Sequence, residues 1–158
     1  MISDRVRALL IQQVGFELSA HQQYYGISLY FEGQSLKKWA RLFHGQSVEE
    51  AQHASKIVSF LVDNDVAMDL PAIGPGTTRY TSAKAAVEAA LESEIRVTGQ
   101  FNALADAAHE AADHRSLQFL QWFIEEQTEE ERTMRELLDL IDSGINLFAA
   151  EQLFDEQS

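Results

Sequence analysis

Four long stretches of the chain repeat apolar residues every three to four positions, which is the spacing of one face of an α-helix. The pattern predicts helices at about 3–31, 36–63, 82–110 and 113–142. A shorter apolar segment at about 145–155 predicts a fifth, brief helix. No stretch alternates as a β-strand does. We therefore expect an all-α fold.

Residues at the predicted boundaries fit these helices. Ser3 and Ser82 stand where a side-chain oxygen can cap the first turn of a helix. Gly144 follows the fourth helix, where a glycine commonly ends one. These residues support the boundaries that the apolar pattern predicts.

The connections between the helices differ in length. FEGQS and HEAAD are short and join antiparallel neighbours. The segment 66–81 between the two hairpins holds both prolines and can span roughly 50 Å when extended. A helix of about 27 residues is about 40 Å long, so this segment can cross the bundle and make the second and third helices parallel. We expect one domain, 1–158, that is a four-helix bundle with a long crossover.

Several polar side chains fall on the inward faces of these helices. The inward face of the first helix is expected to contain Leu10, Val14, Tyr25 and Ser28. Glu17 lies inside that face, and the other three helices show the same feature. The six inward polar residues are Glu17, Glu50, His53, Glu94, Gln127 and Glu130.

These six residues form an internal repeat. An offset of 77 residues relates Glu17 to Glu94, Glu50 to Gln127, and His53 to Glu130. Within each hairpin the first two members are about equally far from the turn, so antiparallel packing places them opposite each other. The repeat predicts that all six lie at one level of the bundle.

Four carboxylates at one level of an apolar core cost several kcal/mol each if they stay charged and unpaired. No lysine or arginine is expected to face them. Two divalent cations would neutralise the four, which are Glu17, Glu50, Glu94 and Glu130. Oxygen ligands with one imidazole suit iron or manganese, and zinc can also bind. The pattern predicts a dinuclear metal site.

Simpler interpretations exist for each residue alone, because a single inward glutamate often reaches back to solvent and a single buried histidine is often a hydrogen-bonded core residue. We interpret His21 as a core histidine or a neighbour of the metal ligands, and His44, His109 and His114 as surface residues. Tyr24 lies on nearly the same face of the first helix as Glu17. It either packs in the core or donates a hydrogen bond or an electron near the metals.

Composition narrows the partners. The chain has 25 acidic and 12 basic side chains, a net charge of −13, which disfavours nucleic acid and anionic membranes and attracts cations. The lack of cysteine excludes disulfides, thiolate zinc sites and iron–sulfur clusters. No apolar signal-peptide core or membrane-length apolar stretch is visible, so we expect a cytoplasmic protein.

Together these residues resemble the ferritins, specifically the haem-free prokaryotic type. The resemblance covers nearly all 158 residues and rests on Glu17 with Tyr24, EEAQH at 49–53, Glu94, and EEQTEE at 125–130. It implies that the first iron is held by Glu17, Glu50 and His53. It implies that Glu50 bridges to a second iron held by Glu94 and Glu130, with Gln127 close by.

The resemblance also implies a third iron position. Its residues would be Glu49, Glu126, Glu129 and Glu130, and Trp122 beside them fits the family pattern. Bacterioferritins carry a haem-ligating methionine directly after the bridging glutamate. This chain has Ala51 there, so no haem is expected.

The function implied by the resemblance is iron storage with ferroxidase activity. Fe²⁺ would be oxidised by O₂ or H₂O₂ at the intra-bundle site and deposited as ferric mineral inside a hollow homo-oligomer of 24 subunits. Two alternatives remain open. One is a di-iron or manganese–iron oxidase or peroxidase that stores no mineral, and the other is a bundle in which the metals only stabilise the fold.

Overall fold

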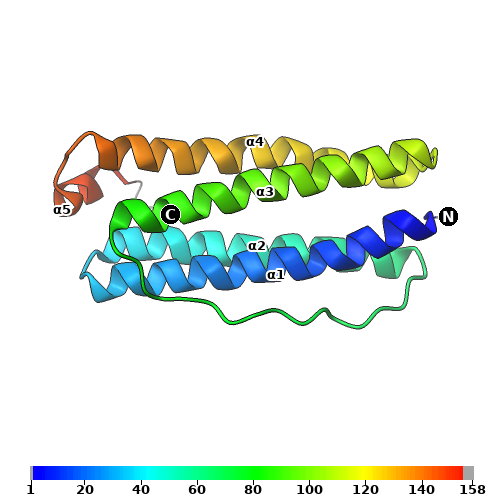
Figure 1. The fold of residues 1–158 in the computed structure, drawn as a ribbon, viewed down its shortest axis with the longest axis horizontal. Helices are drawn as coiled ribbons and strands as arrows, with labels where there is room; N and C mark the ends of the chain where they lie inside the picture. The colour runs from blue at the N-terminus through cyan, green and yellow to red at the C-terminus, as the bar shows by residue number, and fades with distance from the viewer. Residues whose placement is uncertain (1, 155–158) are drawn as a thin grey trace.

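The computed structural model describes residues 2–154, and all regular secondary structure in that range is helical, as predicted. Helices α1 (Asp4–Gly33), α2 (Lys37–Asp63), α3 (Ala83–Glu110) and α4 (His114–Asp142) form an elongated bundle (Figure 1). The short α5 (Leu147–Ala150) and the 3₁₀ turn η1 (Glu151–Leu153) lie at one end of it. The predicted boundaries of the four long helices agree with the observed ones to within about two residues. The predicted fifth helix at about 145–155 is shorter, because only Leu147–Ala150 is α-helical before the 3₁₀ turn, and residue 155 lies outside the described residues. No helix in the described range is long and apolar enough to span a membrane.

The helix ends follow the residues expected to set them. Ser3, Ser82 and Asp113 each accept a hydrogen bond from the backbone N–H three residues later, so all three cap a first turn. Gly144, two residues after the last residue of α4, has φ of +80°, which confirms the predicted glycine stop.

Three other helix ends enter the left-handed backbone region without a glycine. Ser35, Asp65 and Ala112 have φ of 61°, 59° and 51°. In each case the next N–H bonds back to a carbonyl of the last helical turn, at 3.0, 2.9 and 2.8 Å respectively. These closing bonds offset the unfavourable conformation and turn the chain sharply out of α1, α2 and α3.

The crossover between α2 and α3 runs along the length of α1, which makes α2 and α3 parallel as predicted (Figure 1). Two glycines of α1 allow this close approach. A Cβ on Gly26 would lie 2.0 Å from the carbonyl oxygen of Thr77, and one on Gly15 would lie 3.0 Å from Cβ of Pro71. The missing side chains therefore position the extended segment against the helix.

The C-terminal segment caps a distant helix. The N-terminus of α2 has no side-chain cap of its own. Glu151 supplies one, because its Oε2 accepts hydrogen bonds from the backbone N–H groups of Lys38 and Trp39, the latter at 3.1 Å. The indole N–H of Trp39 in turn donates to the carbonyl of Leu147 at 3.0 Å. A carboxylate at this position satisfies free N–H groups and complements the helix dipole.

The interior has two apolar clusters with a polar layer between them. One cluster includes Val14, Ile57, Phe101 and Phe123, and the other includes Tyr24, Phe43, Val87 and Met134. The polar layer consists of Glu17, Glu50, His53, Glu94, Gln127 and Glu130. On every long helix these residues fall between the two apolar sets. The bundle thus places its buried polar groups in one band, with apolar packing on both sides.

The prediction that Tyr25 lies on the inward face is wrong. Tyr25 is 46% exposed, whereas Tyr24 is 1% exposed. Seven residues make nearly two full helical turns, so residue 24 returns to the face of Glu17 and residue 25 is rotated by about 100°. Leu10, Val14 and Ser28 are buried as predicted.

Candidate metal centre

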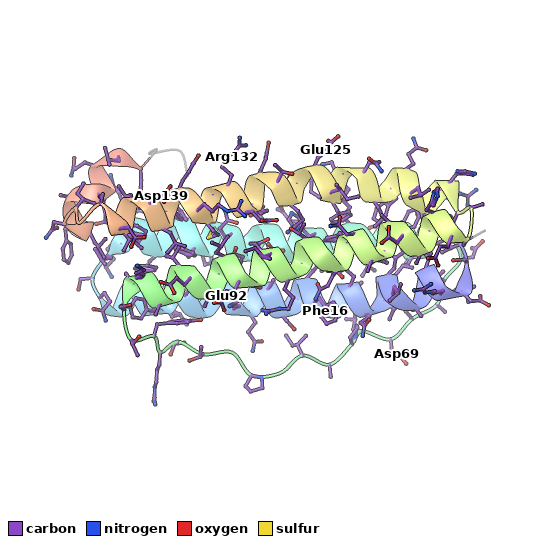
Figure 2. All side chains as sticks on the ribbon, turned by 45° about the horizontal axis from the view of Figure 1, so that its top comes forward. Phe16, Asp69, Glu92, Glu125, Arg132 and Asp139 are labelled. Carbon is purple, nitrogen blue, oxygen red and sulfur yellow. The ribbon has the colours of Figure 1, made fainter. Side chains whose placement is uncertain are left out.

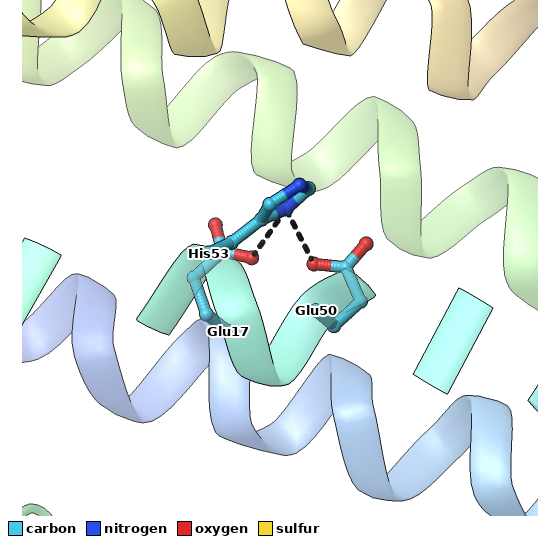
Figure 3. Close-up of side chains that lie close together, drawn as sticks. All are labelled: Glu17, Glu50 and His53. Carbon is cyan, nitrogen blue, oxygen red and sulfur yellow. Dashed lines mark hydrogen bonds and ion pairs between the residues drawn. The ribbon is translucent and has the colours of Figure 1, made fainter. Parts of the chain in front are cut away.

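The first half of the polar layer comes from α1 and α2. Glu17, Glu50 and His53 are all buried. The Nδ1 atom of His53 lies 3.1 Å from Oε2 of Glu50 and 3.7 Å from Oε2 of Glu17 (Figure 3). Each of the three side chains offers one ligand atom, and these atoms lie within 4.8 Å of one another. That separation fits ligands around a single ion.

The second half joins α3 and α4 to the same glutamate of α2. Glu50, Glu94 and Glu130 form another buried group whose ligand atoms lie within 4.8 Å of one another. Two neighbours hold Glu94 in place: the hydroxyl of Tyr24 donates to its Oε1 at 2.7 Å, and Nε2 of Gln127 donates to its Oε2 at 3.0 Å. Because Glu50 belongs to both groups, two ions held by them would be neighbours.

A third group contains His53, Glu126 and Glu130, again within 4.8 Å. The negative charges of Glu49 and Glu126 both act on Glu130, so these two glutamates flank it. Glu129 is exposed and belongs to none of the three groups found in residues 2–154. The resemblance implied that Glu129 belongs to this third position, and the structure does not bring it there.

Unpartnered oxygens show that the layer suits cations. Of the buried side-chain polar atoms without a hydrogen-bond partner in the described chain, three are carboxylate oxygens of this layer: Glu17 Oε2, Glu50 Oε1 and Glu130 Oε2. A buried acceptor without a donor costs about 1–3 kcal/mol, and more when charged. Divalent cations would satisfy such oxygens and neutralise their charge, so the donor set fits iron.

Burial and mutual repulsion also alter the acidity of these groups. Burial raises the pKa of Glu50 well above the ordinary carboxyl value, and the neighbouring carboxylate of Glu17 raises it further. Burial together with the charges of Glu94 and Glu49 raises the pKa of Glu130. Burial raises the pKa of Glu94, while hydrogen bonds from Tyr24 and Gln127 oppose the rise. Without metal, the layer favours protonated carboxyl groups.

Burial also raises the pKa of the Tyr24 phenol well above 10, and the charge of Glu94 adds to the rise. The phenol therefore stays protonated and donates to Glu94. Its ring packs 6.0 Å from that of Phe43. The structure thus gives Tyr24 both a packing contact and a hydrogen bond to the polar layer.

Other polar residues that support the layer were not identified from the sequence. Gln13 is buried one turn before Glu17 and donates through Nε2 to Glu17 Oε1 at 3.2 Å. Thr98 donates to Glu131 at 2.6 Å and lies 3.3 Å from Nε2 of Gln127. Gln13 lies four residues before a predicted ligand on the same helical face, and that spacing could have revealed it.

The remaining histidines lie as interpreted from the sequence. His21 is half-buried, and its Nδ1 lies 2.8 Å from the carbonyl oxygen and 2.9 Å from the hydroxyl oxygen of Ser47, one turn before Glu50. His44, His109 and His114 are exposed. His21 therefore ties α1 to α2 beside the polar layer, which agrees with its interpretation as a core residue near the ligands.

Comparison with known proteins agrees with the fold. The family described as "Ferritin-like domain" matches residues 7–157. The chain is 38% identical over 151 residues to "Ferritin BfrB" of Mycolicibacterium smegmatis, covering 95% of this chain and 83% of that protein. It is 30% identical to the "Probable bacterial non-heme ferritin-like protein" of Haemophilus influenzae, covering 88% and 84%.

A solved structure agrees with these sequence relatives. The structure titled "Humanized Archaeal ferritin" superimposes with a TM-score of 0.92 at 26% identity and covers 96% of both chains. The helix order, the crossover and the sequence relatives all indicate a ferritin. The chain belongs to the ferritin family, among the prokaryotic non-haem ferritins.

Proposed function

We propose that the protein is a ferroxidase that stores iron. The observation that carries the proposal is the pair of buried ligand groups that share Glu50, with three carboxylate oxygens lacking hydrogen-bond partners. Fe²⁺ is the substrate, and each ion gives one electron to O₂ or H₂O₂. Two adjacent positions supply two electrons together, which suits an oxidant that takes electrons in pairs.

Each residue of the layer has a role in this proposal. Glu17 and His53 hold one Fe²⁺, Glu94 and Glu130 hold the other, and Glu50 bridges the two. Two residues act on Glu94 without binding iron in this scheme: Gln127 and Tyr24 donate hydrogen bonds that fix its carboxylate. Two Fe³⁺ ions carry more positive charge than the four carboxylates balance, so hydroxide or oxide derived from water supplies the remaining negative charge and the product leaves as hydrated ferric oxide.

The third group supplies a further position for iron. His53, Glu126 and Glu130 each offer one ligand atom there, and Glu49 lies beside Glu130. Glu129 is exposed, so it would contribute only after a change of rotamer. Glu126 is half-buried, which makes this position better solvated than the first two. Weaker binding there suits an ion that passes through toward the mineral.

Family membership and charge support a storage role. A net charge of −13 draws Fe²⁺ toward the protein. We propose a hollow homo-oligomer of 24 subunits in which ferric mineral accumulates. The alternatives are a non-storing di-iron or manganese–iron oxidase and a bundle that metal merely stabilises.

Iron loading separates these functions. The metal-free protein would receive Fe²⁺ in air in successive additions, and iron that co-elutes with protein would be counted per chain after size-exclusion chromatography. Storage predicts uptake far beyond three ions per chain with catalysed oxidation. Saturation at two or three ions would favour the non-storing oxidase, and oxidation no faster than in protein-free buffer would favour the structural role.

A further inference from the structure

One lysine contacts the aromatic side chain that packs against a member of the third ligand group. Lys56 follows His53 by three residues on α2, so both project from nearby positions on that helix. Its Nζ lies 3.4 Å from the ring centroid of Trp122 on α4. The same indole and the imidazole of His53 pack edge to face, with centroids 5.4 Å apart and ring planes at 80°.

The aromatic contact holds the ammonium group in one place. A cation over an indole face gains about 0.5–2 kcal/mol, depending on solvation. Trp122 is 38% exposed and packs edge to face with Phe123, with centroids 4.9 Å apart and planes at 88°. Lys56 is half-buried rather than extended into solvent. Its positive charge therefore stays near the polar layer instead of sampling the surrounding water.

Glu126 connects this lysine to the ligand group. Burial lowers the pKa of the Lys56 ammonium, and the negative charge of Glu126 acts in the opposite direction. The same glutamate offers a ligand atom to the group with His53 and Glu130. A divalent ion in that group would thus bind a carboxylate that already interacts with a fixed positive charge, and it would be repelled by that charge.

We propose that Lys56 is a built-in cation that weakens metal binding at the group of His53, Glu126 and Glu130. This inference rests on the proposed function and names a residue that limits tight binding to two positions per chain. The positive charge of Lys56 partly neutralises Glu126, as a third metal ion would, and Lys56 binds no iron itself. A lysine that only packed against Trp122 would leave metal affinity unchanged when its charge was removed.

Calorimetric titration of the metal-free assembled protein with Zn²⁺ tests the proposal, because Zn²⁺ binds such ligands without redox chemistry. Lys56→Met keeps most of the apolar stem and removes the charge. Lys56→Arg keeps the charge. Lys84→Met is the control for net charge, because Lys84 is exposed and pairs with Asp142 at 2.8 Å, away from the layer.

The wild type is expected to bind two Zn²⁺ per chain tightly and a third weakly. Lys56→Met should tighten the third event about tenfold, a change of about 1.4 kcal/mol. Lys56→Arg and Lys84→Met should leave it unchanged. Adding Glu126→Gln to Lys56→Met should abolish the increase in affinity for the third Zn²⁺.

Two results would overturn the proposal in distinguishable ways. A third event with equal affinity in the wild type and Lys56→Met, with the first two events intact, would overturn the role of Lys56 alone. Absence of the two tight events from the wild type would overturn the dinuclear centre and this inference with it.

Discussion

At the scale of single residues, the polar layer is a set of carboxyl groups whose acidity depends on metal. Burial is the largest cause that raises the pKa values of Glu50, Glu94 and Glu130 in the metal-free fold. The folded protein therefore binds more protons than the unfolded chain at pH values above the ordinary carboxyl pKa. Such groups stabilise the fold at low pH, and that stabilisation is lost as the pH rises toward their folded-state pKa.

The metal-free protein should consequently melt at a lower temperature at pH 7.5 than at pH 5.5. Within the titration window each such group lowers the unfolding free energy by about 1.4 kcal/mol per pH unit. Glu50→Gln removes one titrating group and should reduce this pH dependence. Calorimetric melting with a chelator present measures it, and an equal or steeper dependence in Glu50→Gln would contradict the assignment.

Tyr24 offers a second residue-scale prediction. Tyr24→Phe keeps the ring and removes the hydroxyl that donates to Glu94 at 2.7 Å. A hydrogen bond to a charged group contributes about 1.5–3 kcal/mol, so the affinity for the second of two Zn²⁺ should fall by about tenfold or more. The first affinity should stay unchanged. Calorimetry measures both, and equal values in both proteins would assign Tyr24 to packing alone.

At the scale of helices, the two hairpins present equivalent positions to one centre. Equal distances from the hairpin turns predicted that Glu17 faces Glu50 and that Glu94 faces Gln127, and all four residues lie in one buried layer. The pattern of apolar and polar residues was sufficient for this result, because the helices are long and run side by side with these residues at the same level. It was insufficient for Tyr25, where an error of one residue on the wheel changes the face.

Contacts between segments that are distant in sequence could not be predicted in the same way. Periodicity says nothing about which residue caps α2, and Glu151 does so from more than a hundred residues away. The left-handed conformation of Ala112 likewise has no glycine to reveal it. The fit of the crossover against Gly15 and Gly26 requires knowing where an irregular segment runs.

The crossover gives the element-scale prediction. Gly26→Ala would place a Cβ against the backbone carbonyl of Thr77, so the segment must move away from α1. Trypsin should then cut faster after Arg79, which lies in the exposed crossover. Gly45→Ala is the control, because a Cβ there meets nothing within 4 Å in the chain. Equal cleavage rates in wild type and Gly26→Ala would show that the contact is not restrictive.

At the scale of the whole molecule, one chain leaves apolar side chains uncovered. Phe148 and Leu153 at the C-terminal end are 55% and 67% exposed. Leu147 and Phe154 are half-buried against the end of the bundle, where the ring centroids of Phe154 and Trp39 are 4.8 Å apart. The exposed pair still favours contact with other subunits.

We therefore expect a large assembly in place of a 17.8 kDa monomer. Light scattering coupled to size-exclusion chromatography at low micromolar concentration should give a mass near that of 24 chains. Monomers or dimers alone would contradict the shell. Phe148→Asp should lower the assembled fraction, because it replaces an apolar side chain, which we expect at a subunit contact, with a charged one.

The most direct test of the ferroxidase centre is the initial rate of Fe²⁺ oxidation at two ions per chain. Glu50→Ala and His53→Ala should each lose the fast phase while the assembled mass is retained. Glu125→Ala should oxidise Fe²⁺ as the wild type does, because Glu125 points outward from α4 (Figure 2). Stopped-flow absorbance measures these rates. Unchanged initial rates in both ligand variants would show that oxidation occurs elsewhere.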